Sequence, residues 1–260
     1  MIIDDIVAAT KKRIARDKEL ITYEAMKAKA LSLPIDDEFP FEKALRKDGV
    51  SFICEVKKAS PSKGLIAPDF DFVSIAKEYE RIGADAMSVL TEPDFFQGDI
   101  SYLDAIHKQV SIPLLRKDFI IDDYMIYQAK AAGASAILLI ASLLDLETLT
   151  KYQALAHSLG LSALVEAHNP EEIDKALAAG ASIIGINNRD LRDFTVDIHN
   201  SLRYRHLIPD DVLFVSESGI DSRAQIEELE DNHVQAVLIG ETMMRAKDKQ
   251  AMINRLRGVV

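Results

Sequence analysis

Short apolar runs alternate with longer amphipathic stretches along most of the chain. Eight runs rich in Ile, Val and Leu lie at residues 52–56, 86–90, 113–115, 136–141, 163–165, 183–186, 212–215 and 236–239. Stretches with apolar residues at helical spacing follow them, for example at residues 73–82, 124–132 and 143–159. Several stretches end at a glycine that suits the position after a helix, namely Gly83, Gly133, Gly160 and Gly180. The pattern predicts eight strand–helix units.

Strands that are separated by helices run parallel and are buried on both faces. Eight such units predict an α/β fold, a closed (β/α)8 TIM barrel, over residues 51–260. An open doubly wound sheet is the alternative, because it has the same alternation of strands and helices. We expect one domain in either case.

The first 50 residues follow a different pattern. Apolar residues recur there at roughly helical spacing, with basic residues between them, at Ile3, Ile6, Val7, Ile14 and Leu20. Residues 33–40 have the composition of a linker, and residues 41–46 suit a short helix. We therefore expect residues 1–50 to form an N-terminal helical extension that packs on the barrel.

Polar residues stand at the C-terminal end of nearly every apolar run. They are Glu55, Lys57, Thr91, Glu92, Lys117, Asp118, Glu166, Asn187, Asn188, Arg189, Ser216, Glu217, Ser218, Glu241 and Thr242. In a parallel barrel these ends form one rim, where such enzymes build their active sites. Alternation along the first strand aims Ile53, Glu55 and Lys57 into the barrel, and Cys54 toward the helices. Glu55 and Lys57 are then either a structural ion pair or functional groups, and Cys54 is a buried apolar residue rather than a nucleophile.

Small residues after three of the strands indicate phosphate binding. Ser60-Pro61-Ser62-Lys63-Gly64 follows the first run, Ser218-Gly219 the seventh and Gly240-Glu241-Thr242 the eighth. Loops after the last two strands of such a barrel form its usual phosphate site, where backbone N–H groups approach the oxygens. The chain contains neither GxGxxG nor GxxxxGK[ST], so a dinucleotide or nucleoside triphosphate site is not indicated.

Composition excludes several other classes of function. The chain has 31 Lys and Arg against 42 Asp and Glu, a formal charge of −11, which opposes nucleic acid as a partner. The single cysteine, Cys54, excludes an internal disulfide, and no histidine has a partner at metal-ligand spacing, so we expect no metal site. No apolar run approaches the ~20 residues of a membrane span, and the charged N-terminus does not suit a signal peptide. We expect a cytoplasmic protein without a membrane partner.

Seven motifs carry a family resemblance. They are FICEVKKASPSKG (52–64), SVLTEPDFFQG (88–98), PLLRKDFI (113–120), ALVEAH (163–168), IGINNRDL (184–191), VSESGI (215–220) and LIGETMM (238–244). In this order they closely resemble indole-3-glycerol phosphate synthase, the tryptophan-pathway enzyme that closes the indole pyrrole ring. The similarity extends to the helical extension that the family carries before its first strand.

The resemblance implies a phosphosugar substrate, 1-(2-carboxyphenylamino)-1-deoxyribulose 5-phosphate. The implied products are indole-3-glycerol phosphate, carbon dioxide and water, formed by a carboxy-lyase without metal or cofactor, which we expect to be a monomer. By match of motif, Lys117 is the general acid for ring closure, with Glu55 and Lys57 beside it. Glu166 acts on the departing hydroxyl and Asn187 orients it. The two lysines are expected to lower each other's pKa.

The resemblance also assigns binding residues. The substrate-binding set is Arg189, Glu217, Phe95 and Phe119. By their positions after the second and third runs, Phe95, Phe96 and Phe119 are either packing residues or rings on which an aromatic substrate leans. The phosphate-binding set is Ser60, Ser218, Gly219, Gly240, Glu241 (through its backbone) and Thr242. A glutamate beside a phosphate is tolerable only where its side chain turns away, which we expect of Glu241.

Three other functions stay open on the residues alone. Phosphoribosylanthranilate isomerase, a sister barrel, needs a Cys general base on the first strand and an Asp on the sixth, where this chain has Asn187-Asn188. A non-catalytic phosphosugar-binding barrel has no need for paired lysines. An aldolase that forms a Schiff base makes Lys117 its nucleophile.

Overall fold

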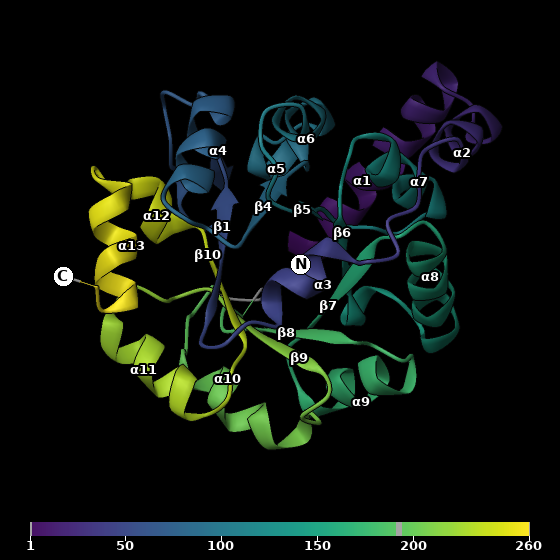
Figure 1. The fold of residues 1–260 in the computed structure, drawn as a ribbon. Coiled ribbons are helices and arrows are strands. Elements are labelled where there is room, and N and C mark those ends of the chain that lie inside the picture. The colour runs from purple at the N-terminus through teal and green to yellow at the C-terminus, as the bar shows by residue number, and fades with distance from the viewer. Residues whose placement is uncertain (1, 191–193, 260) are drawn as a thin grey trace.

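The computed structural model describes residues 2–190 and 194–259, whose strands form a closed parallel barrel (Figure 1). The hydrogen-bonded order is β1-β10-β9-β8-β7-β6-β5-β4, and β1 closes the barrel by pairing with both β10 and β4. The bounds are β1 (Ser51–Val56), β4 (Ala86–Leu90), β5 (Leu114–Lys117), β6 (Ala136–Ile140), β7 (Ser162–Ala167), β8 (Ile183–Asn187), β9 (Leu213–Glu217) and β10 (Ala236–Ile239). The predicted (β/α)8 barrel is confirmed, and the open sheet is wrong.

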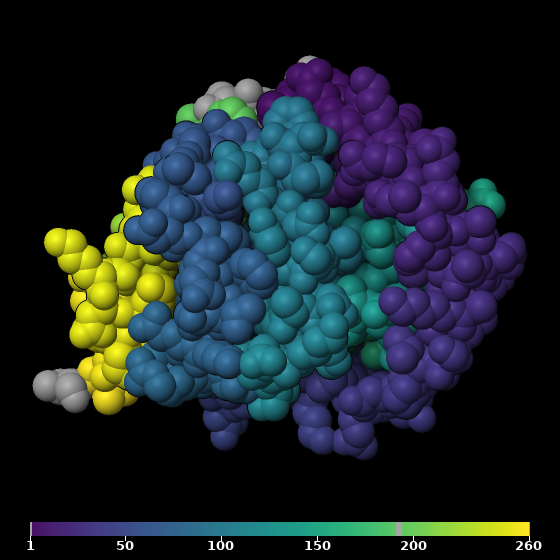
Figure 2. Space-filling view, turned by 90° about the horizontal axis from the view of Figure 1, so that it is seen from above, coloured from purple at the N-terminus to yellow at the C-terminus, as the bar shows by residue number. Residues whose placement is uncertain are grey.

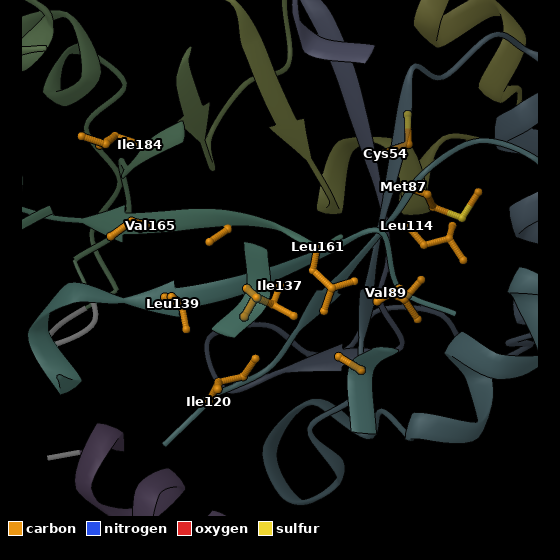
Figure 3. Close-up of a cluster of buried hydrophobic side chains, with 14 of the residues drawn as sticks. Cys54, Met87, Val89, Leu114, Ile120, Ile137, Leu139, Leu161, Val165 and Ile184 are labelled. Atoms are coloured by element: carbon orange, nitrogen blue, oxygen red, sulfur yellow. The ribbon is translucent and has the colours of Figure 1, made fainter. Parts of the chain in front are cut away.

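Each strand divides its side chains between two buried layers. Ile53, Leu115 and Leu164 belong to the cluster inside the barrel, whereas Cys54 belongs to the larger cluster between strands and helices. The register pairs Cys54 with Met87, and Figure 3 shows these side chains in the outer cluster. The predicted orientation of Cys54 is therefore confirmed, and Glu55, one residue later, faces the interior.

Helices surround the barrel (Figure 1). They are α4 (Phe72–Arg81), α6 (Ile100–His107), α7 (Asp123–Ala131), α8 (Leu146–Ser158), α9 (Pro170–Ala178), α10 (His199–Tyr204), α11 (Arg223–Asp231) and α13 (Lys249–Arg257), with the short α5 (Pro93–Phe96) and α12 (Glu241–Arg245). Two predicted helices match α4 and α7 to within a residue. The third begins later than predicted, because a 3-10 turn (Ala141–Leu143) comes first and Asp145 then caps α8. The loop after β1 also contains an unpredicted hairpin, β2 (Ala59–Ser60) with β3 (Gly64–Leu65).

Three helices precede the barrel, α1 (Ile2–Leu20), α2 (Tyr23–Leu31) and α3 (Pro40–Leu45). The first and last agree with the predicted elements, but α2 was not predicted. Figure 2 shows this purple segment covering one side of the molecule, next to the teal part of the chain. The Tyr124 hydroxyl in α7 donates hydrogen bonds to the carbonyls of Asp17 and Ile21, which anchors the end of α1. Within residues 2–190 and 194–259, no helix combines the length and apolar character needed to cross a bilayer.

A buried network of charges fixes α1 to the end of β5. Arg13 donates to Asp118 Oδ1 at 2.7 Å, and Arg116 donates to Asp118 Oδ2 at 3.1 Å. The Thr91 hydroxyl donates to the same Oδ2 at 2.5 Å. All four side chains are buried, so Thr91 and Asp118 serve this network rather than presenting free polar groups on the rim. The network therefore supports the strand end from which Lys117 projects.

Candidate active site

A cavity of about 820 Å³ opens at the C-terminal ends of the strands. It brings together most of the residues predicted from the sequence: Glu55, Lys57, Ser60, Lys117, Phe119, Glu166, Asn187, Arg189, Ser218, Gly219, Gly240, Glu241 and Thr242 line it. Phe95 and Glu217 are absent from the wall that the described residues form. The N-terminal helix contributes Ile2, Ile3 and Ile6, which were not predicted as site residues.

Lys117 is held among carboxylates. Its Nζ lies 2.6 Å from Glu217 Oε2 and 3.5 Å from Glu166 Oε2. Burial alone would lower the pKa of Lys117, but the charges of Glu217, Glu166 and Glu55 outweigh it and raise the pKa above its ordinary value. The expectation that neighbouring lysines lower it is wrong for Lys117, because the carboxylates are the nearer charges. Lys117 is therefore an ammonium group at neutral pH.

The two carboxyl groups beside Lys117, those of Glu166 and Glu217, differ in pKa. Burial raises the pKa of Glu217 to about 7, although Lys117 opposes the rise. Burial also disfavours ionised Glu166, but Lys117 and His168 outweigh it and hold its pKa well below the usual range. Glu217 is nearer to Lys117, yet Glu166 is the more acidic group because it contacts a second cation. Glu217 therefore contacts Lys117 but does not itself line the cavity, although it was predicted as a substrate-binding residue.

Glu55 and Lys57 form an ion pair at the end of β1. Glu55 is buried and Lys57 is largely so. Gly240 makes room for them, because a Cβ atom there would lie 2.2 Å from Glu55 Oε1 and 2.8 Å from Lys57 Nζ. Gly240 was predicted as a phosphate residue, and its position also explains how two charged side chains fit in the mouth of the barrel.

Most of the predicted phosphate residues lie directly after β9 and β10. Ser218 and Gly219 have φ angles of 68° and 83°, a left-handed conformation that turns the chain after β9. The Thr242 hydroxyl donates to the Ile220 carbonyl at 2.8 Å, so it is already engaged. Glu241 Oε1 lies 3.0 Å from Arg245 Nε and 3.6 Å from Lys63 Nζ. Lys63 and Arg245 also line the cavity; Lys63 belongs to the predicted phosphate motif after the first strand but was not named as a site residue, and Arg245 was not predicted.

Aromatic side chains form a third part of the wall. Phe96 and Phe119 lie with ring centroids 6.0 Å apart, and both line the cavity. Phe95 and Phe96 both pack beside the cluster inside the barrel, but of these two only Phe96 lines the cavity. Glu92 accepts hydrogen bonds from three backbone N–H groups of α5, and this cap sets which of the two phenylalanines faces the cavity.

Asn187 and Arg189 lie at the end of β8. The backbone N–H of Arg189 donates to Asn187 Oδ1 at 3.0 Å, and Arg189 Nη1 donates to the Phe194 carbonyl at 3.3 Å. Asn188 points elsewhere and binds Ser201 and Ser216. The last residue of this motif, Leu191, lies outside the described residues.

The sequence reasoning also did not assign His168 to the site. His168 Nε2 lies 3.2 Å from Glu166 Oε1, whereas Lys117 is nearest to the other carboxylate oxygen, Oε2. His168 comes two residues after Glu166 and directly after the end of β7, so the alternation of the strand was a usable signal. Within the described ranges no group of three or more His, Cys, Asp or Glu is arranged to hold a metal ion.

Comparison with known proteins identifies the family. The family profile for indole-3-glycerol phosphate synthase matches residues 3–256. An indole-3-glycerol phosphate synthase of Ruminiclostridium cellulolyticum is 51% identical over 258 residues, covering 99% of each chain. One of Endomicrobium trichonymphae is 52% identical over 257 residues, covering 99% of this chain and 100% of the relative.

Solved structures support the fold alone. A 3-hexulose-6-phosphate synthase superimposes with a TM-score of 0.65 at 15% identity, covering 81% of this chain and 100% of the other. Likeness at that identity says nothing about the reaction. The sequence relatives, in contrast, match along the whole chain, site included. The chain therefore belongs to the indole-3-glycerol phosphate synthase family, carboxy-lyases of tryptophan biosynthesis.

Proposed function

We propose that this chain converts 1-(2-carboxyphenylamino)-1-deoxyribulose 5-phosphate to indole-3-glycerol phosphate, carbon dioxide and water. The observation that carries the proposal is the position of Lys117, a cation between Glu217 and Glu166 at the mouth of the barrel. Aromatic rings line the same cavity, and so do small residues and two cations, Lys63 and Arg245. Such a wall suits a ligand with an aromatic ring at one end and a phosphate at the other.

Ring closure needs an acid at the ribulose carbonyl. We assign this role to Lys117, whose ammonium donates a proton to the carbonyl oxygen as the anthranilate ring carbon attacks the carbonyl carbon. The new carbon–carbon bond forms as the carbonyl π pair moves to oxygen. Glu217 then serves as the group that keeps Lys117 protonated and fixed, since it contacts its Nζ at 2.6 Å.

Decarboxylation and dehydration come after ring closure and take place in the same cavity. The carbon–carboxylate bond breaks, carbon dioxide leaves, and its electron pair restores the aromatic ring. The hydroxyl made from the carbonyl then accepts a proton and departs as water. The neighbouring CH2 carbon, which is bonded to nitrogen, loses a proton in exchange, and the electron pair of that C–H bond forms the indole double bond. We assign Lys57 to the substrate carboxylate and to this later proton, with Glu55 as its partner. Glu166 and Asn187 act on the departing hydroxyl.

The substrate phosphate fits the part of the cavity that the segments after β1, β9 and β10 line. Backbone groups of Ser218, Gly219 and Gly240 and the hydroxyl of Ser60 are its proposed partners. Lys63 and Arg245 supply positive charge once Glu241 turns from them. Arg189, Phe96 and Phe119 then enclose the rest of the substrate.

A direct assay tests the function. The protein is incubated with the carboxyphenylamino deoxyribulose phosphate, and indole fluorescence is followed over time. We expect turnover by the natural chain and a loss of at least 10²-fold in Lys117→Met, which keeps the length of the side chain without its charge. Absence of fluorescence at micromolar enzyme refutes the proposal, and an active Lys117→Met removes this lysine from the mechanism.

The monomeric state and the cytoplasmic location remain proposals as well. A phosphorylated sugar is charged and does not cross a membrane unaided, so an enzyme that consumes it belongs where the sugar is made. Sedimentation at micromolar concentration tests the first proposal against the 28.9 kDa of one chain. Fractionation of the source cells tests the second.

A further inference from the structure

A second cavity, of about 780 Å³, lies next to the first. Asn187 lines both cavities, and His168 and Glu172 line the second. The other charged groups that face it are Asp4, Glu171, Asp190, Asp197 and Arg203. His168 therefore lies between this second cavity and Glu166, which lines the first.

His168 bridges two carboxylates. Its Nε2 lies 3.2 Å from Glu166 Oε1, and its Nδ1 lies 3.1 Å from Glu172 Oε2. The backbone N–H of His168 also donates to Glu172 Oε2, at 2.9 Å. The Asn169 side chain donates to the other oxygen of Glu172 at 2.8 Å. Hydrogen bonding to Glu172 holds the Nδ1 side of the imidazole, and Nε2 faces Glu166 in a charge contact without hydrogen-bond geometry; only 18% of the side chain is exposed.

The two oxygens of Glu166 contact different cations. Oε2 faces Lys117, which Glu166 shares with Glu217 and, at longer range, with Glu55. Oε1 faces His168. Burial would lower the pKa of His168, but Glu166 and Glu172 outweigh it and raise the pKa to about 10. His168 is therefore a cation at neutral pH. Without it, Glu166 and Glu217 would share Lys117 as their cation, and the pKa values of these two carboxyl groups would differ less.

We propose that His168 is a positioning residue for the synthase reaction, which binds Glu166 Oε1 as a cation and so determines which carboxylate beside Lys117 carries the negative charge. Glu172 orients the ring for this contact. His168 acts through Glu166 and does not touch the substrate. The inference rests on the proposed function, since it concerns the group that acts on the departing hydroxyl.

The test is the pH dependence of kcat in His168→Gln. Gln keeps an N–H donor of similar reach but carries no charge. We expect kcat to fall at least tenfold at pH 6 with KM changed less than threefold, because the substrate contacts stay in place. The acidic limb of the kcat profile, which belongs to the Glu166–Glu217 pair, should move up by about one pH unit. His206→Gln, the same change at an exposed position, is the matched control and should leave the profile unchanged.

Glu172→Gln is the second variant, in case His168→Gln does not fold. It removes one of the two anions on His168 and should move the acidic limb in the same direction by a smaller amount. An unchanged profile in a variant that melts like the natural protein overturns the proposal, as does a loss confined to KM. An inactive natural chain would instead refute the proposed function, so the two failures are distinguishable.

Discussion

Gly240→Ala tests whether the mouth of the barrel leaves room for anything beyond the Glu55–Lys57 pair. Gly240 joins β10 to α12, and a Cβ atom added to it would lie 2.2 Å from Glu55 Oε1. Its φ of −105° lies in the half of conformational space that alanine also adopts. The substitution therefore changes the space at the ion pair, with little change in the backbone.

The expected loss follows from the distance. An ordinary contact with a Cβ atom begins near 3.4 Å, so the Glu55 carboxylate has to move by about 1.2 Å. Glu55 is 3% exposed and has little free space into which to move. A displacement of ~1 Å in catalytic geometry costs on the order of 10²-fold in rate, or about 2.7 kcal/mol of barrier. We expect this loss in kcat, with the melting temperature within a few degrees of the natural protein.

The assay is the initial rate of indole fluorescence at saturating substrate, beside a thermal melt. Gly180→Ala is the control, because this glycine follows α9 with a φ of 83° and a Cβ there would meet no described atom within 4 Å. It should lose ~1 kcal/mol of stability and keep kcat. A Gly240→Ala variant with kcat within threefold of the natural protein would show that Glu55 moves freely or is not needed.

Three further predictions concern charge, thiol reactivity and phosphate. Because the pKa of Glu217 is raised to about 7, its contribution to stability is complete below the ordinary carboxyl range and lost as pH rises to about 7. The melting temperature of the natural protein should therefore fall as pH rises over this interval, and it should fall less in Glu217→Gln. An equal fall in both proteins would contradict the raised pKa of Glu217. Burial raises the pKa of Cys54 to about 12, so a thiol reagent at pH 8 should react only after unfolding, and Cys54→Ser should keep kcat within about twofold. A hundredfold loss in folded Cys54→Ser would favour the isomerase chemistry. Gly219→Val should raise KM and weaken inhibition by inorganic phosphate, because its Cβ would lie 2.5 Å from Val196 in a strained backbone; equal inhibition constants would move the phosphate site elsewhere.

The barrel was predictable because its signals are local. Alternation in β1 was enough to aim Ile53 inward and Cys54 outward, and glycines marked the ends of helices. Helix α2 was not predicted because it buries only Met26 and Ala30, which are too few to produce the helical spacing of apolar residues. The hairpin of β2 and β3 is two residues a side, too short for any periodicity.

The candidate site was predictable as a set of residues but not as an arrangement of charges. The family motifs supplied Lys117, Glu166 and Glu217, yet Lys117 and Glu217 are 100 residues apart and their contact depends on the closed barrel. Their pKa values depend on such distances and on burial, so the expected proximity of Lys57 and Lys117 gave the wrong direction for the pKa of Lys117. The choice between Phe95 and Phe96 likewise depends on the cap of one short helix.

The ion pair between Arg13 and Asp118 has a consequence for synthesis of the chain. Arg13 is made first, but its partner lies 105 residues later. At about 5–20 residues per second, the ribosome needs roughly 5–20 s to add that stretch. During this interval α1 has nowhere to dock, and Ile2, Ile3 and Ile6 are exposed to the cell. The helix whose first residues line the mouth of the barrel is thus made before the strand end that holds it, and β1, β4 and β5, three of the eight barrel strands, have to be made before Arg13 can pair with Asp118.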